Sequence, residues 1–298
     1  MTAWLAVLAA LGESACAALS GTLQHKTASR GRTETTTPTG HLAAFARHQT
    51  GQPLWWTAQG VQAGALILHA SALQLGSLTL VQPVVATVVV LALPLNHRIN
   101  RSRITRPEML WAGIVTASLA SFLLVAAPTP AAGPIATHRL AVPAIAATAA
   151  IASCVLIARW GSPRTAALAL GSASGLAFSL EAALLQITTT ALLHDPLTAL
   201  TDPSLYGLVI AGVAGVTLTQ LAYRAGPISA ALPAIITINP LASVFLGVLV
   251  AGDQIRTSQA ALAVEAASFA CLVVAVAALS RFPDATPPVA PASEESSQ

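Results

Sequence analysis

The sequence predicts an all-α polytopic membrane protein of about nine transmembrane helices, arranged as an inverted repeat of four helices, one connector helix and four more helices. Three observations predict this class. Hydrophobic residues make up 55% of the 298 residues and charged residues only 8%, whereas a soluble domain carries roughly 25% charged residues. The apolar runs are long enough to cross a bilayer, and one stretch occurs twice. We therefore expect one membrane domain.

Nine apolar runs are the predicted transmembrane helices. They cover residues 3–23, 53–75, 78–95, 107–127, 140–158, 165–191, 204–223, 228–250 and 258–280. Each is close to the roughly 20 residues that a spanning helix needs, and none alternates like a membrane strand. The transmembrane domain is therefore expected over residues 1–281. The tail over residues 282–298 is rich in Pro, Ser and acidic residues, which predicts a disordered cytoplasmic segment.

The duplicated stretch lies at residues 72–94 and 222–244, at a constant offset of 150. Three identities hold the alignment: Ala72 with Ala222, Gly76 with Gly226 and Pro83 with Pro233. It predicts repeat A over about residues 3–127 and repeat B over about residues 165–281, with a connector helix at 140–158. Five crossings would separate equivalent helices, so the halves would enter the membrane from opposite sides. Such inverted repeats are typical of many secondary transporters.

The basic residues predict the orientation. With the amino terminus outside, 12 of the 14 Lys and Arg residues lie on the inward side, and only Arg139 and Arg256 face outward. Cytoplasmic loops attract Lys and Arg. We therefore expect a multi-pass protein of the plasma membrane, with its amino terminus outside and its carboxyl terminus in the cytoplasm.

Several classes of site and partner are disfavoured. Cys16, Cys154 and Cys271 lie inside apolar runs without a CxxC pattern, so we expect no disulfide framework and no zinc site. We expect no cofactor and no nucleic-acid partner. The adjacent pair His194-Asp195 is better explained as a turn than as catalytic machinery, so we expect no enzyme. Membrane lipid and a small-molecule or cation substrate are the expected partners, and a homodimer is compatible with them.

Two acids in the middle of apolar runs are the leading site candidates, because polar groups in hydrocarbon are costly. Glu13 shares one helix face with Ser20 and Gln24. Glu181 has Ser174 and Thr188 seven residues to either side. Each carboxylate could couple transport to protons or bind a cation. The alternative is a protonated glutamic acid that hydrogen-bonds a neighbouring helix.

Other polar residues extend the candidate set. His69, Gln62 and Gln59 form a stripe on the second predicted helix, where the histidine could relay protons or serve as an interhelical donor. Glu265 lies in the first third of the last helix, near its outer end, where it could act at the mouth of a pathway. Glu108 begins a helix, and its carboxylate is explained by the helix dipole.

Prolines inside the repeated stretch predict hinges or cavity-lining turns. Pro83, Pro233 and Pro240 interrupt apolar runs, and a proline frees a backbone carbonyl one turn earlier in a helix. Asn239 precedes Pro240 and is a candidate to bind substrate or to cap the freed carbonyl.

The chain resembles the drug/metabolite transporter superfamily, in particular its NIPA-like magnesium transporters and EamA-like bacterial relatives. The stretches that carry the resemblance are Pro53-Leu54-Trp55-Trp56, residues 72–83 (ALQLGSLTLVQP), residues 220–233 (QLAYRAGPISAALP) and Asn239-Pro240-Leu241. One departure is Asp253 after Gly252, where the family often has glutamate. The resemblance implies transport across a membrane.

Three functions follow as hypotheses. The first is a secondary transporter that moves a small metabolite, drug or cation through a cavity lined by Glu13, Glu181 and His69, with protons as coupling ion. The second is a NIPA-like magnesium transporter, since Mg²⁺ prefers carboxylates together with retained waters. The third is a membrane scaffold or sensor without transport, in which neutralising the buried acids would have no effect.

Overall fold

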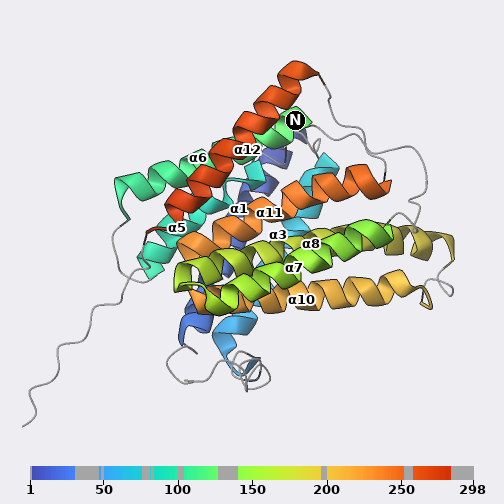
Figure 1. Cartoon of the computed structure of the whole chain (residues 1–298), viewed down its shortest axis with the longest axis horizontal. Coiled ribbons are helices and arrows are strands. Elements are labelled where there is room, and N and C mark those ends of the chain that lie inside the picture. Colours follow the sequence, from blue (N-terminus) through green and yellow to red (C-terminus); the bar gives the residue numbers. More distant parts are fainter. Residues whose placement is uncertain are drawn as a thin grey trace, which may run out of the picture.

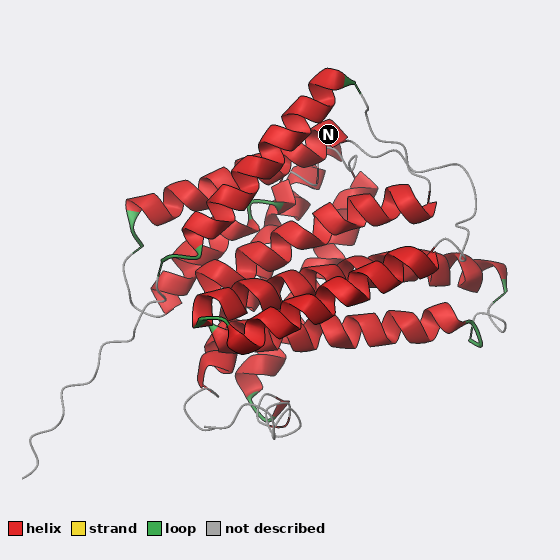
Figure 2. Ribbon diagram, in the orientation of Figure 1, coloured by secondary structure: helices red, strands yellow, loops and turns green. Residues whose placement is uncertain are grey.

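A computed structural model describes residues 2–30, 47, 50–75, 81, 84–99, 104–126, 140–195, 200–251 and 258–282. Within these ranges the regular structure is helical throughout (Figure 2). The elements, in chain order, are α1 (Thr2–Arg30), α3 (Pro53–Leu75), α5 (Val88–Ile99), α6 (Arg106–Ala126), α7 (Ala141–Trp160), α8 (Pro163–His194), α10 (Pro203–Ala225), α11 (Ile228–Leu246), the π-helical turn η2 (Gly247–Ala251) and α12 (Gln259–Leu279). The predicted all-helical class is confirmed for this part of the chain.

Seven of the described helices are long and apolar enough to cross a membrane: α1, α6, α7, α8, α10, α11 and α12. Two of the predicted spans are not among these seven helices. The 23 residues of α3 include Gln59, Gln62 and His69, which lower its hydropathy, and α5 has only 12 residues. A chain with so many apolar helices is a multi-pass membrane protein.

The first helix is longer than predicted. The first predicted span ends at Leu23, but α1 continues to Arg30. The added turns bury polar residues, since Gln24, His25 and Thr27 are all enclosed by the bundle. The Thr27 hydroxyl donates to the Gln24 carbonyl at 2.8 Å. Hydropathy alone underestimates the length of α1, because the side chains at this end of the helix are polar and buried together.

The third predicted helix is interrupted. Residues Val84 and Val85 are helical, Ala86 and Thr87 form a turn, and α5 begins only at Val88. The Thr87 backbone N–H donates to the Val84 carbonyl at 3.0 Å, a bond one residue shorter than the α-helical pattern. The proline predicted to interrupt this run, Pro83, lies outside the described residues.

The helices pack as neighbouring pairs (Figure 1). α1 packs along α3, α8 packs along both α10 and α11, and α7 covers α8. α12 packs on α6 at one edge of the molecule, and α1 also contacts α10. The connector α7 contributes no buried residue, whereas α1, α8 and α11 supply much of the core.

Small residues let the central helices approach closely. A Cβ on Gly171 of α8 would lie 2.7 Å from the Ala231 carbonyl oxygen of α11, and one on Gly175 would lie 2.9 Å from Ile238 Cβ. Real Cβ atoms do not come so close, so α8 and α11 need glycine at both positions. Membrane helices commonly pack through small residues in this way.

Candidate functional site

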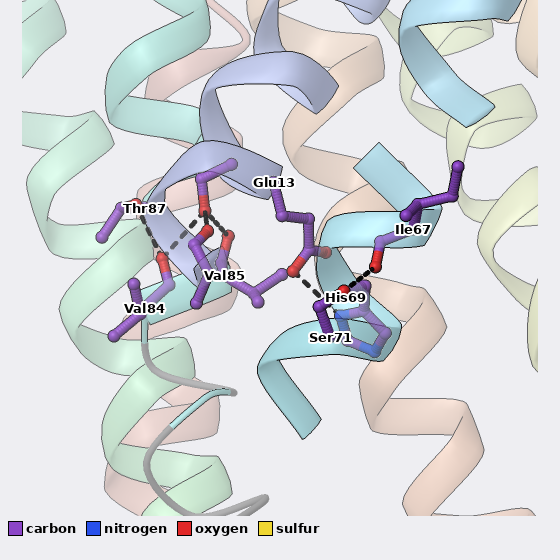
Figure 3. Close-up of polar contacts among 9 residues, drawn as sticks. Glu13, Ile67, His69, Ser71, Val84, Val85 and Thr87 are labelled. Atoms are coloured by element: carbon purple, nitrogen blue, oxygen red, sulfur yellow. Dashed lines mark hydrogen bonds and ion pairs between the residues drawn. The ribbon is translucent and has the colours of Figure 1, made fainter. Parts of the chain in front are cut away.

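Glu13 and His69 form a pair between α1 and α3. Glu13 Oε2 lies 2.9 Å from His69 Nδ1, and the two side chains point toward each other (Figure 3). The side chain of Glu13 is 11% exposed and that of His69 is 29% exposed. The sequence predicted both as candidates, but on separate stripes. The structure therefore places the predicted acid and the predicted proton relay at one site.

The interrupted helix lies on the other side of α1 (Figure 3). Ser14 follows Glu13 in the chain, and its Oγ lies 3.1 Å from the Val84 carbonyl oxygen and 3.4 Å from that of Val85. Thr116 of α6 donates to the carbonyl of Ala86 at 3.2 Å. Irregular backbone at membrane depth is tolerated where its polar groups are satisfied by protein or line a cavity. Here hydroxyl groups of two neighbouring helices provide that compensation.

A second polar cluster lies further along α1 and connects three helices. Gln220 Nε2 of α10 donates to Gln24 Oε1 at 2.5 Å. Gln24 Nε2 donates to Ser20 Oγ, and Ser20 Oγ donates to the Ala58 carbonyl of α3, each at 2.9 Å. We call Gln220, Gln24 and Ser20 the glutamine bridge. The predicted stripe of Glu13, Ser20 and Gln24 thus faces α3 and α10.

A second histidine–glutamate pair joins α5 to α6. His97 Nε2 lies 2.9 Å from Glu108 Oε1, and both side chains are buried. Glu108 and Thr105 also form a capping box at the start of α6. The Glu108 backbone N–H donates to Thr105 Oγ1 at 3.4 Å, and the Thr105 N–H donates to Glu108 Oε2 at 3.5 Å. Glu108 therefore does more than offset the helix dipole.

Glu181 lies on α8 in a different environment from Glu13. Its Oε1 would lie 3.0 Å from a Cβ on Gly212 of α10, so the carboxyl occupies space that Gly212 leaves open. Ser174 donates to the Gly215 carbonyl at 2.9 Å, and Thr188 donates to Ser204 Oγ at 3.1 Å. The predicted stripe on α8 therefore faces α10 along its length. No hydrogen bond or ion pair among the described residues joins Glu181 to Glu13 or His69.

The remaining candidates are spread over the bundle. Gln62 is exposed on α3. Asn239 Oδ1 accepts a hydrogen bond from Ser243 Oγ at 3.4 Å. Glu265 is partly buried on α12, with Oε1 enclosed. Pro233 and Pro240 both lie inside α11, which remains one helix from Ile228 to Leu246. Their assignment to a binding site or hinge stays a prediction.

A carboxylate–imidazole pair suits proton exchange. With one proton between them, Glu13 and His69 are together neutral whichever side chain holds it, and a neutral pair costs less in hydrocarbon than a lone ion. Loss of that proton leaves one negative charge, which could receive a cation. Imidazole changes charge near neutral pH. Within the described residues, no group of three or more His, Cys, Asp or Glu side chains is placed so that it could hold a metal ion.

Ionisable groups at the ends of the helices have structural roles. Asp202 precedes α10 and accepts a hydrogen bond from the Ser204 backbone N–H at 2.8 Å. Hydrogen bonds from the backbone and side chain of Ser204 lower the pKa of this carboxyl. This is the ordinary behaviour of a carboxylate at a helix N-terminus. Asp202 therefore contributes to the start of α10.

The chain is similar to an uncharacterized protein of Corynebacterium glutamicum. The two are 26% identical over 230 residues, which are 77% of this chain and 80% of that protein. No family model matches the chain, and no solved structure matches it. The similarity extends over most of both sequences, and the name of the relative states no activity.

Sequence reasoning missed two polar contacts that connect helices. Gln220, which donates to Gln24, lies in the stretch that carries the family resemblance but was not predicted as a site residue. Nothing in the sequence relates two positions that are 196 residues apart. The His97–Glu108 pair could have been approached from the Thr105-x-x-Glu108 spacing, which is the signature of a capping box. That spacing predicts a buried or capped Glu108 but does not identify His97.

Proposed function

We propose that the chain is a proton-coupled secondary transporter of the drug/metabolite transporter type, which moves a small metabolite, drug or cation. The observation that carries the proposal is the Glu13–His69 pair. It lies between two helices of a membrane bundle, and an ionisable residue at such depth is by default a functional group. The alternative is that Glu13 is a protonated glutamic acid that only hydrogen-bonds a neighbouring helix through this contact, and it predicts full transport in a Glu13→Gln variant.

Proton coupling follows from the charge states of the pair. A proton and a cationic substrate would compete for the deprotonated Glu13–His69 pair, because each restores its neutrality. Such competition at one carboxylate is enough to couple the exit of one to the entry of the other when access alternates between the two sides.

The arrangement of the helices supports two related halves. α3 and α10 both have 23 residues, at the offset of 150 that relates the repeated stretches. α6 and α12 both have 21 residues. The polar stripe of α1 faces α3, and that of α8 faces α10. We therefore propose the inverted repeat, with the basic ends of the helices in the cytoplasm and the amino terminus outside.

Transport into proteoliposomes tests the function. Purified protein in liposomes with an imposed pH gradient should drive uptake of a cationic dye, and Glu13→Gln should reduce the initial rate by about tenfold or more because the pair can no longer release its proton. Thr57→Ala is the matched control for insertion and folding, because Thr57 is exposed on α3 and its hydroxyl donates to the Pro53 carbonyl of the same helix at 3.0 Å. Uptake by Glu13→Gln equal to that of the parent protein would contradict the proposal.

The same liposomes separate the alternatives. Magnesium entry reported by a trapped magnesium-sensitive dye, independent of the pH gradient and without dye uptake, would favour the NIPA-like hypothesis. A folded parent protein that moves neither protons, dye nor magnesium would favour the scaffold or sensor. Gradient-dependent uptake of the dye alone supports the proton-coupled transporter.

A further inference from the structure

We infer that the glutamine bridge is a gate that closes one end of the Glu13–His69 site and separates during transport. The inference rests on the proposed transport function. It names the contact that must break for the site to open toward the end of the bundle where α1 and α10 end.

The bridge connects the two halves of the chain. Gln24 and Ser20 belong to α1, the first helix of repeat A, whereas Gln220 belongs to α10 of repeat B. A weaker contact runs alongside, since His25 Nε2 lies 3.4 Å from the Gly226 carbonyl oxygen at the turn after α10. Any motion that separates the halves at this end must break both contacts.

The surroundings of the bridge are closely packed. Ser20 is fully buried, and Gln24 and Gln220 are 8% and 5% exposed. A Cβ on Gly21 would lie 3.2 Å from Tyr223 Oη, so α1 and α10 approach closely beside the bridge. The Tyr223 ring meets the His25 ring edge to face at 5.7 Å. By contrast, the His69 side chain at the other cluster is 29% exposed. The bundle therefore encloses the bridge, whereas the His69 side chain is partly exposed.

The chemistry of the bridge suits a contact that opens. Its members are amides and a hydroxyl, which carry no net charge, so water can replace each partner without exposing an unpaired ion. A buried ion pair would resist separation far more strongly, because each freed charge would have to be rehydrated or neutralised. The bridge also ends on the Ala58 carbonyl of α3, so its state is linked to the helix that carries His69.

A cross-link tests the gate. In a background where Cys16, Cys154 and Cys271 are replaced by serine, Gln24→Cys with Gln220→Cys should form a disulfide on oxidation. The disulfide should abolish gradient-driven dye uptake, and reduction should restore it. The matched control is Ser174→Cys with Thr219→Cys, whose parent hydroxyls lie 2.7 Å apart on α8 and α10. Both helices belong to repeat B, so this disulfide should leave uptake unchanged.

A second measurement needs no substrate. Ala17 lies one turn from Glu13, on the side of the bridge, so Ala17→Cys reports entry of water-soluble reagents toward the pair. Gln220→Met keeps side-chain volume but removes the bond to Gln24, and it should raise labelling by a membrane-impermeant thiol reagent about tenfold from the cytoplasmic side only. Uptake that persists in the cross-linked pair, or labelling unchanged by Gln220→Met, would overturn the gate. Loss of uptake in Glu13→Gln tests the proposed function separately.

Discussion

Two histidine–glutamate pairs with the same contact distance differ in their surroundings. Glu13–His69 and His97–Glu108 both close at 2.9 Å. The first joins α1 to α3, and its histidine is partly exposed. The second joins α5 to the first turn of α6, and its histidine and glutamate are only 8% and 3% exposed.

The partners of the two carboxylates differ as well. Glu108 also takes part in the capping box with Thr105, so its orientation is held by backbone as well as by His97. Among the described residues, the Glu13 carboxylate has the His69 ring as its one hydrogen-bonding partner. A carboxylate with one ionisable partner can exchange that partner for a substrate, whereas a carboxylate held at several points serves best as a structural clamp. Identical chemistry thus suits different roles, depending on burial and further hydrogen bonds.

Replacing each histidine in turn is the strongest test of the difference between the two pairs. We expect His69→Asn to lower gradient-driven uptake by about tenfold or more, because asparagine can bond Glu13 but cannot exchange a proton. His97→Asn should leave the uptake per folded molecule close to that of the parent protein. Initial rates in proteoliposomes, normalised to folded protein, provide the measurement. Equal losses in the two variants would show that both pairs serve the same role.

For the stability of the fold, we expect the larger loss on disrupting the His97–Glu108 pair and the smaller loss on disrupting the Glu13–His69 pair. Glu108→Ala leaves His97 without its carboxylate in a buried site, and loss of one partner of a buried pair costs about 3–5 kcal/mol. Thermal unfolding in detergent should therefore begin at a clearly lower temperature. Glu108→Gln retains a hydrogen-bonding group of the same shape and should cost less. If Glu13→Ala were less stable than Glu108→Ala, the structural role would belong to the Glu13–His69 pair instead of the His97–Glu108 pair.

The smallest expected effect on stability concerns the capping box that helps to hold Glu108. Thr105→Ala removes the hydroxyl that accepts the Glu108 backbone N–H, and loss of an N-cap costs about 1 kcal/mol. Thr217→Ala is the control, because Thr217 is exposed and bonds only its own helix at Val213. Its effect should stay within about 0.5 kcal/mol. A change as small in Thr105→Ala would mean that the cap does not help to hold Glu108.

Much of the fold was accessible from the sequence. The bounds of α3 coincide with the predicted run of residues 53–75, and those of α6, α7, α10 and α12 lie within about two residues of the predictions. The predicted bounds are wrong in two regions, where local hydropathy does not reflect how the chain is packed. The last turns of α1 are polar yet buried, and the run that contains Pro83 is interrupted before Val88. Contacts with other helices compensate the polar side chains at the end of α1 and the free backbone carbonyls of residues 84–86, and hydropathy does not count either kind of contact.

The sequence by itself determined the helical membrane class, the approximate spans and the short set of polar residues within them. Hydropathy, length and composition belong to each segment and need no neighbour. Only the tertiary structure decided that Glu13 meets His69, 56 residues away, and that Gln24 meets Gln220. A contact between side chains depends on the rotation and axial register of two helices, and both are set by packing against residues distant in the chain.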